Sequence, residues 1–578
     1  MREFGLPPTR RAILQGSAAL AGAGLVADVA RSQARAAQPV APALSPLVSD
    51  IDDYVAEVMK GRRTPGVSLA VTDRSGLLFA RQYGHANLDA DLPVLPETRF
   101  AFGSVGKTFT AVLIMQLVEE GKVDLHVPVT RYLPWFRVQS DHAPITIHHL
   151  LSHTSGLIYG SEFSPGAAAE VWALRDLGVS GPPGGPFHYS NVGYKTLGLI
   201  IEAVTAMPYR QAVQERIFDP LGMERAANAI SNEIRDDIAT GYIPLFDDRP
   251  PLPEADLVVA PWIESSTADG SLAASATELA AFLRALLDEG RGPRRRLLDA
   301  RSVALMAEPV ADMGNGTHYG YALFNGELYG RRRIGHTGGV VGYAAVMFGL
   351  PESGIGAVVL SNGPGDPVAI ARHVLAATAA FAEGRPPPDP PRIPDPTRVE
   401  NAADYAGTYS GAMRSLTVDA DGNGLFLRHD GGRWRLLQRG PDAFSADHTD
   451  FALYFVRFGR DEDGKAVEMT YGPEWLAGAA HAGPRDFDVP EAWKAYPGHY
   501  RSHNPWHPSF RIGLRQGGLW LFSPDGGEER LEPTATGFRP PAGPNSPLRL
   551  SFDQVVDGKA QRARWNGGDD TYYRFFTD

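Results

Sequence analysis

The chain has 578 residues, 43% hydrophobic and 21% charged, which is typical of a soluble globular protein with more than one domain. Its formal net charge is −12, and this acidic excess argues against a nucleic-acid partner, because phosphate binding needs clustered Lys and Arg. The absence of cysteine excludes disulfides, thiolate nucleophiles and cysteine-based zinc sites.

The N-terminal segment predicts export. Arg10 and Arg11 precede an apolar stretch rich in Ala and Gly, from Gly16 to Val26, and Ala34–Ala36 offers a small-residue cleavage site. Segment 1–36 is therefore expected to be a signal peptide, and its paired arginines resemble a twin-arginine signal; an ordinary secretory signal or a disordered tail are the alternatives. The stretch is too short for a transmembrane span, so a periplasmic or secreted protein is expected.

The predicted elements follow in chain order. Apolar residues recur with helical spacing between 47 and 59, and two strands are expected at 67–71 and 77–80. A long apolar helix is expected from about Ser104 to Glu120. Further along the chain, a hairpin is expected at 344–350 and 355–360, followed by a helix at 368–381. Strands and helices at both ends with a helical middle predict an α+β domain over residues 44–384.

The C-terminal third predicts a different architecture. Residues 385–398 are rich in proline, which makes a stiff linker rather than a packed element. Beyond the linker the sequence repeats itself, because Tyr405–Tyr409 (YAGTY) matches Tyr496–Tyr500 (YPGHY). Short apolar strands alternate with Gly/Asp turns in each unit, so two small antiparallel β-barrels are expected, at 399–488 and 489–578. One sheet of eight to ten strands across both units is the alternative.

The first candidate catalytic segment contains Ser104 and Lys107. Residues three apart at a helix start lie on one face, so a neutral lysine amine can take the proton of the serine hydroxyl. Burial would favour the neutral amine, and the helix N-terminus supplies positive potential for an oxyanion. The S-x-x-K pattern alone is a weak signal, but its position at the start of a strongly apolar helix strengthens it.

Two further segments add candidate residues. Tyr189 follows a turn rich in Gly and Pro and can act as a general base or proton relay, and Asn191 can hydrogen-bond a substrate amide. Residues 335–339 (GHTGG) begin a strand whose glycines allow a substrate backbone to approach closely. The backbone N–H of Gly339 is expected to form an oxyanion hole with that of Ser104.

Together, S-x-x-K at 104–107, Y-x-N at 189–191 and H-T-G at 336–338 resemble the serine β-lactamase and penicillin-binding-protein superfamily, on its class C branch. The resemblance covers about 44–384 and implies an antiparallel sheet flanked by helices, with an all-helical subdomain.

The resemblance also implies roles for individual residues. Ser104 would become the acyl-enzyme, Lys107 and Tyr189 would share the acid and base work, and Asn191 would position the substrate amide. The strand containing His336, Thr337, Gly338 and Gly339 would dock the substrate, without a cofactor or metal.

Two departures from the class C pattern refine the expected activity. His336 replaces the usual lysine, and because His is mostly neutral near pH 7, strong β-lactamase activity is not expected. H-T-G resembles D-alanyl-D-alanine carboxypeptidases, alkaline D-peptidases and D-aminopeptidases. The two-barrel tail is similar to that of D-aminopeptidases, in which a loop of the tail shapes the active-site entrance.

The sequence therefore predicts an exported serine hydrolase acting on amide bonds of peptides that contain D-amino acids, with a small peptide, amide or ester as substrate. A carboxylesterase of the same fold is one alternative, and a penicillin-binding sensor or non-catalytic ligand-binding protein is another. His142, His148, His149 and His153 lie close in sequence but lack a metal-binding pattern, and are interpreted as packing residues.

Overall fold

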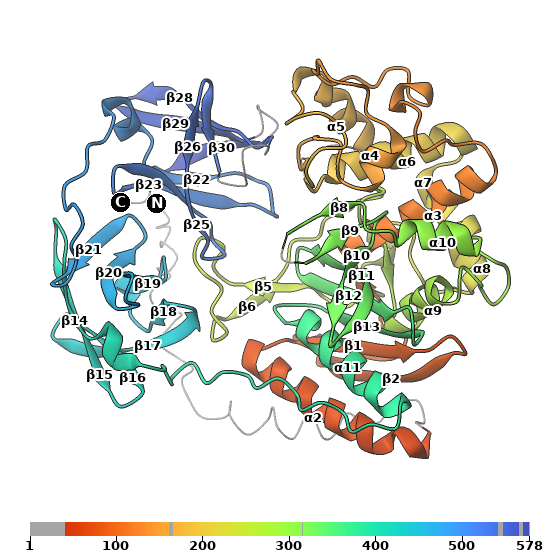
Figure 1. The fold of residues 1–578 in the computed structure, drawn as a ribbon, viewed down its shortest axis with the longest axis horizontal. Coiled ribbons are helices and arrows are strands. Elements are labelled where there is room, and N and C mark those ends of the chain that lie inside the picture. The colour runs from red at the N-terminus through yellow and green to blue at the C-terminus, as the bar shows by residue number, and fades with distance from the viewer. Residues whose placement is uncertain (1–40, 161–165, 315, 541–546, 566–569, 577–578) are drawn as a thin grey trace, which may run out of the picture.

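The protein is described by a computed structural model that covers residues 41–160, 166–314, 316–540, 547–565 and 570–576 (Figure 1). The predicted signal peptide, 1–36, lies outside the described residues. Within these ranges, none of the helices combines the length and the apolar character that crossing a bilayer requires.

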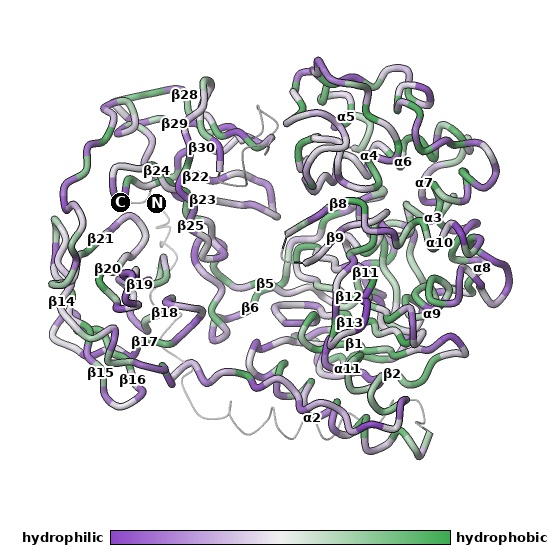
Figure 2. The backbone as a smooth tube through the Cα atoms, viewed as in Figure 1, coloured by the Kyte–Doolittle hydropathy of each residue, from purple (hydrophilic) through white to green (hydrophobic). Residues whose placement is uncertain are grey.

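An antiparallel sheet of nine strands forms the centre of the N-terminal part, in the order β3-β2-β1-β13-β12-β11-β10-β9-β8. Its strands are β1 (Gly66–Thr72), β2 (Leu77–Asn87), β3 (Leu92–Pro93), β8 (Ala311–Asp312), β9 (His318–Tyr319), β10 (Phe324–Leu328), β11 (Arg331–Val340), β12 (Tyr343–Leu350) and β13 (Ile355–Ser361). The predicted strands and hairpin are confirmed, although β2 is longer than expected. Every residue of β1 and β13 is buried, and Figure 2 shows hydrophobic residues along these central strands.

Helices cover both faces of this sheet. α2 (Ser45–Arg62) and α11 (Pro367–Ala382), predicted from the sequence, pack against one face, where Val359 of β13 joins their core. α3 (Gly106–Glu119) and α9 (Ala276–Leu287) share a core with Leu360. Since successive strand residues point to opposite faces, these neighbours on β13 mark the two layers of the α+β domain.

A mainly helical region lies between α3 and β8 in sequence. It contains α4 (Ile147–Leu151), α5 (Ala167–Ala173), α6 (Asn191–Thr205), α7 (Tyr209–Val213), α8 (Asp219–Leu221) and α10 (Ala300–Met306). Two small ladders accompany these helices, β4 (Phe100–Ala101) with β7 (Ala273–Ala274) and β5 (Tyr242–Pro244) with β6 (Leu257–Val259). The β5–β6 pair extends from the domain toward the C-terminal units (Figure 1).

The first C-terminal unit is a closed barrel of eight strands. Its strands are β14 (Gly407–Ser410), β15 (Ser415–Asp421), β16 (Gly424–His429), β17 (Gly432–Gly440), β18 (Ala443–Ala446), β19 (Val456–Arg460), β20 (Ala466–Tyr471) and β21 (Glu474–Gly478). Pairing of Tyr409 with Gly478 closes it, so no strand edge stays open.

The second unit is a separate nine-stranded sheet that is nearly closed. Its order is β25-β24-β23-β22-β30-β29-β28-β27-β26, and its edge strands are joined by the single residue Leu531. The strands are β22 (Gly498–Arg501), β23 (Ser509–Arg515), β24 (Gly518–Phe522), β25 (Glu528–Arg530), β26 (Glu532–Thr534), β27 (Gly537–Arg539), β28 (Leu550–Val556), β29 (Lys559–Trp565) and β30 (Asp570–Phe575). The alternative of one sheet across both units is therefore wrong.

The repeated tyrosine motif makes the same contact in both units. The hydroxyl of Tyr409 donates to the carbonyl oxygen of Tyr405 at 2.9 Å, and the hydroxyl of Tyr500 donates to that of Tyr496 at 2.7 Å. Each tyrosine thus ties the first strand of its unit to the turn before it, which explains why the motif recurs.

Candidate active site

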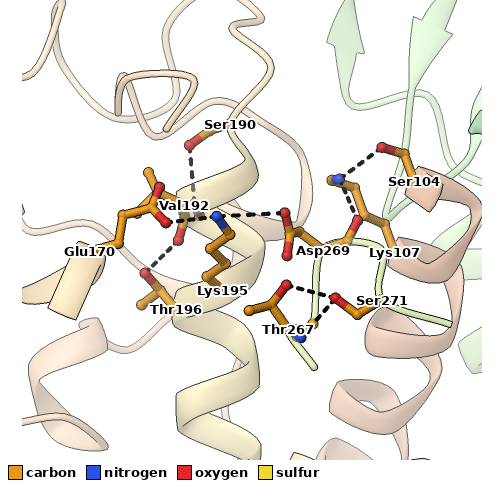
Figure 3. Close-up of polar contacts among 12 residues, drawn as sticks. Ser104, Lys107, Glu170, Ser190, Val192, Lys195, Thr196, Thr267, Asp269 and Ser271 are labelled. Carbon is orange, nitrogen blue, oxygen red and sulfur yellow. Dashed lines mark hydrogen bonds and ion pairs between the residues drawn. The ribbon is translucent and has the colours of Figure 1, made fainter. Parts of the chain in front are cut away.

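Ser104 and Lys107 lie together at the start of α3. Ser104 belongs to a 3-10 turn over Gly103–Val105, and the α-helix begins at Gly106, two residues later than the sequence predicts. Lys107 Nζ lies 3.1 Å from Ser104 Oγ and donates to the carbonyl oxygen of Asp269 at 2.7 Å (Figure 3). The turn therefore presents the hydroxyl to an amine that is itself fully buried.

Glycines allow β11 to approach this turn. Gly103 has a φ of +50°, a left-handed conformation that glycine adopts without strain. A Cβ on Gly338 would lie 2.0 Å from the carbonyl oxygen of Phe102 and 3.0 Å from the backbone nitrogen of Ser104, so a larger residue does not fit there. The same close approach brings Gly339 beside the turn, which places the two predicted oxyanion-hole residues side by side.

Tyr189 lies over the amine of Lys107, with its ring centre 4.9 Å from Nζ. The buried His153 fixes this loop from two sides: its carbonyl oxygen accepts from the backbone N–H of His188 at 2.8 Å, and its Nδ1 accepts from that of Ser190 at 3.0 Å. Its ring also packs on Tyr189, with 4.3 Å between ring centres. Burial and the nearby Lys107 hold the pKa of His153 well below its usual range, so its imidazole stays neutral and can accept.

His336 is buried, and both of its ring nitrogens are engaged by the protein. Its Nδ1 contacts the carbonyl oxygen of Thr337, which can only accept, so Nδ1 carries the proton. Its Nε2 therefore accepts from the hydroxyl of Tyr319, at 2.9 Å. Burial, together with the nearby Lys107, lowers the pKa of His336 to about 3. The residue at the position of the family lysine is therefore a neutral ring.

Two cavities meet at Ser104. The larger, of about 520 Å³, is lined by Tyr189 and by the strand residues His336, Thr337, Gly338 and Gly339. The smaller, of about 400 Å³, is lined by Asn191, Lys195 and Asp269 among others, and it also includes Gly339. All the predicted site residues except the buried Lys107 thus line one or both cavities, and Lys107 contacts Ser104 from beneath.

The C-terminal unit contributes to this site. Pro505, Trp506 and His507, in the loop between β22 and β23, line the larger cavity, and Trp506 also lines the smaller one. The loop is therefore part of the entrance, a contribution that the repeat pattern of the sequence did not reveal.

A group of buried charges borders the smaller cavity. Lys195 Nζ lies 2.6 Å from Glu170 Oε2 and 3.9 Å from Asp269 Oδ2, and all three side chains are less than a tenth exposed (Figure 3). Sequence reasoning missed these residues, although Lys195 follows Asn191 by four residues, one turn along α6.

Histidines elsewhere are explained by local contacts. His148 Nδ1 lies 2.6 Å from the hydroxyl of Tyr321. Among the described residues, the side chains of His429, His448 and Asp450 lie close enough together to hold a metal ion. They belong to the first barrel and line neither cavity.

Known proteins are similar in sequence to this chain. The sequence model of the family described as Beta-lactamase matches residues 51–381, more than half of the chain. Penicillin-binding protein 4 of Amycolatopsis lactamdurans is 32% identical over 315 residues, which cover 52% of this chain and 81% of that protein. Esterase EstB of Burkholderia gladioli is 32% identical over 198 residues, which cover 31% of this chain and 50% of that protein.

A solved structure agrees with these matches. The D-amino acid amidase from Ochrobactrum anthropi SV3, complexed with D-phenylalanine, superposes with a TM-score of 0.50 at 25% identity, covering 59% of this chain and all of that one. The chain therefore belongs to the beta-lactamase family, whose class C-like branch its motifs fit, and is a serine hydrolase.

Proposed function

We propose that this serine hydrolase forms an acyl-enzyme on Ser104 and cleaves amide bonds of peptides containing D-amino acids, as a D-aminopeptidase or a D-alanyl-D-alanine carboxypeptidase does. The observation that carries the proposal is the 3.1 Å contact between Lys107 Nζ and Ser104 Oγ at the junction of two cavities. The similar penicillin-binding protein and D-amino acid amidase support this reaction class. Export through the twin-arginine-type segment 1–36 is part of the proposal.

Acylation begins with proton transfer from Ser104 to the neutral amine of Lys107. Complete burial removes the hydration that an ammonium needs and so favours the neutral base. Ser104 Oγ then attacks the substrate carbonyl, and the tetrahedral oxyanion is stabilised by the backbone N–H groups of Ser104 and Gly339. Asn191, at the first turn of α6, positions the amide on the acyl side.

Tyr189 passes the proton to the leaving group. Its ring lies over Lys107, so the proton taken from Ser104 can reach the departing amine through the phenol. The bond between the carbonyl carbon and the amine breaks, and the acyl group stays on Ser104. Water then attacks the acyl-enzyme ester and gives one proton to the Lys107–Tyr189 pair. That proton returns to the Ser104 oxygen as the carboxylic acid leaves.

The neutral His336 argues against a dedicated β-lactamase. A lysine at this position supplies a fixed positive charge to a substrate carboxylate, whereas a buried imidazole that hydrogen-bonds Tyr319 and Thr337 supplies none. The same observation favours a carboxylesterase as the second candidate function, because a neutral site accepts ester substrates that lack a carboxylate. The similarity to Esterase EstB supports this alternative.

Turnover of paired substrates tests the proposal. Purified protein and its Ser104→Ala variant are assayed on 4-nitroanilides of D- and L-alanine and on 4-nitrophenyl esters. Preferential release of nitroaniline from the D-substrate by the wild type alone is expected. Ester hydrolysis without D-anilide turnover would favour the esterase, and full activity of Ser104→Ala would contradict the mechanism.

A further inference from the structure

The smaller of the two cavities takes the acyl half of the substrate. Tyr189, which protonates the leaving amine in the proposed function, lines only the larger cavity. The leaving group must occupy the space next to its proton donor, so the other side of the scissile carbonyl extends toward Asn191 and Asp269. This assignment rests on the proposed function.

Buried charges at the wall of this acyl cavity are predominantly negative. Among the described residues that line the cavity, Lys195 is the one cation, and Glu170 and Asp269 flank its ammonium at 2.6 Å and 3.9 Å. Glu264, which is exposed, adds a third carboxylate to the described residues that line the cavity. Lys107 lies on the other side of Asp269, against its backbone carbonyl, and serves as the neutral base.

Asp269 is the residue of this group that can receive a ligand. Its Oδ2 faces Lys195, while its Oδ1 is buried and makes no hydrogen bond in the described part of the chain. Asp269 is 6% exposed and lines the cavity. Among the described residues, neither carboxylate oxygen of Asp269 has a hydrogen-bond donor, since Lys195 Nζ lies beyond hydrogen-bond distance of Oδ2. Because Oδ1 is closed to solvent, a cationic N–H group of a ligand would approach the carboxylate from its cavity side and supply the missing donor there.

We infer that Asp269, supported by the Glu170–Lys195 ion pair, binds an alkylammonium group on the acyl half of the substrate. With Lys195 and one substrate ammonium, the charges of the two buried carboxylates are balanced. A substrate carboxylate in the same place would add to the net negative charge of Glu170, Asp269 and Lys195 and is disfavoured. The ammonium can be the free α-amine of an N-terminal residue or the amine of a longer side chain such as lysine.

Two substrate pairs distinguish these sources. Free D-norleucine 4-nitroanilide against its N-acetyl form tests an α-ammonium, and N-acetyl-D-lysine 4-nitroanilide against N-acetyl-D-norleucine 4-nitroanilide tests a side-chain ammonium. We expect the wild type to prefer the cationic member of at least one pair by about tenfold or more in kcat/KM. Equal kcat/KM within both pairs would overturn the inference.

The Asp269→Asn variant links the preference to this carboxylate. The ratio of kcat/KM for the cationic substrate to kcat/KM for the neutral one should fall to within about twofold, and because it is a ratio, a general loss of activity in the variant cancels. Glu528→Gln is a matched control, because Glu528 forms a comparably buried ion pair with Arg515 in the second sheet, at 2.7 Å, and lines neither cavity. A preference that survives Asp269→Asn would overturn the inference.

Labelling of Ser104 separates this inference from the proposed function. If a fluorophosphonate labels the wild type and cationic and neutral D-amides protect it equally, the ammonium site is wrong and the serine hydrolase stands. If no labelling occurs, or Ser104→Ala is labelled equally, the proposed function itself fails. Protection by D-norleucinamide or N-acetyl-D-lysinamide, but not by N-acetyl-D-norleucinamide, is the expected result.

Discussion

At the scale of single residues, the site depends on neutral groups that hold reactive ones in place. His153 accepts a hydrogen bond from the backbone of Ser190 and packs on Tyr189, and His336 bonds Tyr319. Because both imidazoles are buried beside Lys107, a charge on either would oppose a proton on the lysine. Neutral histidines therefore suit a lysine that must accept a proton during the reaction.

His153→Ala is expected to lower kcat about tenfold or more with little change in KM, because one buried hydrogen bond that orients Tyr189 is lost. Steady-state kinetics on the preferred substrate measure this split. His373→Ala is the control, since His373 is also buried but packs on Tyr54 beneath the sheet. Equal losses of kcat in both variants would mean that His153 acts only through general stability.

The low pKa of His336 predicts a pH-dependent part of the stability. The unfolded imidazole, with a pKa of about 6.5, binds a proton that the folded one, with a pKa of about 3, does not. The contribution of the neutral His336 to the free energy of unfolding is therefore complete above pH 6.5. It is lost as the pH falls toward 3, because proton binding then favours the unfolded chain. Urea unfolding should show a smaller loss of stability between pH 7.5 and 4.5 in His336→Gln than in the wild type. Identical losses would show that His336 does not titrate in this way.

At the scale of elements, short loops from distant parts of the chain complete the site. The loop between β22 and β23 brings Trp506 to both cavities, and Ile243 of β5 lines the larger one. Tyr572 donates to the backbone carbonyl of His507 at 3.0 Å, which fixes this loop to its own sheet. The entrance is therefore built by an element that lies outside the family domain.

Trp506→Ala is expected to raise KM for peptide substrates several-fold and to leave labelling of Ser104 by a small fluorophosphonate nearly unchanged, because the reactive groups stay in place while the cavity walls retreat. Trp172→Ala, which removes an exposed tryptophan from α5, serves as the control. An unchanged KM in Trp506→Ala would show that the loop does not contact substrate.

At the scale of the whole molecule, the β5–β6 connection links the domain to both C-terminal units (Figure 1). Arg439 of the first barrel forms an ion pair with Glu254 at 2.9 Å, and Arg501 of the second sheet forms one with Asp247 at 2.6 Å. Arg511 bonds Asp248, also at 2.9 Å. These ion pairs are partly exposed, so they hold the entrance loop by contacts that salt weakens.

Raising NaCl from about 0.05 to about 0.5 M shortens the Debye length about threefold. This change should therefore raise KM about twofold or more. The double variant Asp247→Asn with Asp248→Asn should show a raised KM at low salt and little further dependence on salt. A neutral substrate is used, so that screening of the substrate charge does not contribute. An equal salt dependence of the variant would place the effect elsewhere.

Much of the architecture could be predicted from local pattern. The periodicity of 47–59 and 368–381 predicted α2 and α11, and the alternation of short strands predicted two barrels. The sequence did not predict that the edge strands of the second sheet meet at Leu531 and nearly close it. Strand order depends on pairings between residues that are far apart in sequence. The start of α3 was misplaced because the 3-10 turn around Ser104 continues the same apolar pattern.

The candidate site was predictable where a motif marks it. Ser104, Tyr189 and Gly339 belong to short motifs, and the structure brings these segments together around two cavities. Asp269 and Trp506 were missed, since each reaches the site through tertiary packing that no local spacing encodes. The sequence predicted only a packing role for His153, and its hydrogen bond to the Tyr189 loop depends on tertiary structure.

The central claim is that Ser104 becomes covalently acylated with Lys107 as its base. Intact-protein mass spectrometry after reaction with a fluorophosphonate, followed by peptide mapping, measures this most directly. The account predicts one adduct, on Ser104, no adduct in Ser104→Ala, and labelling slowed by about two orders of magnitude in Lys107→Ala. An adduct on another residue, or undiminished labelling of Ser104→Ala, would contradict it.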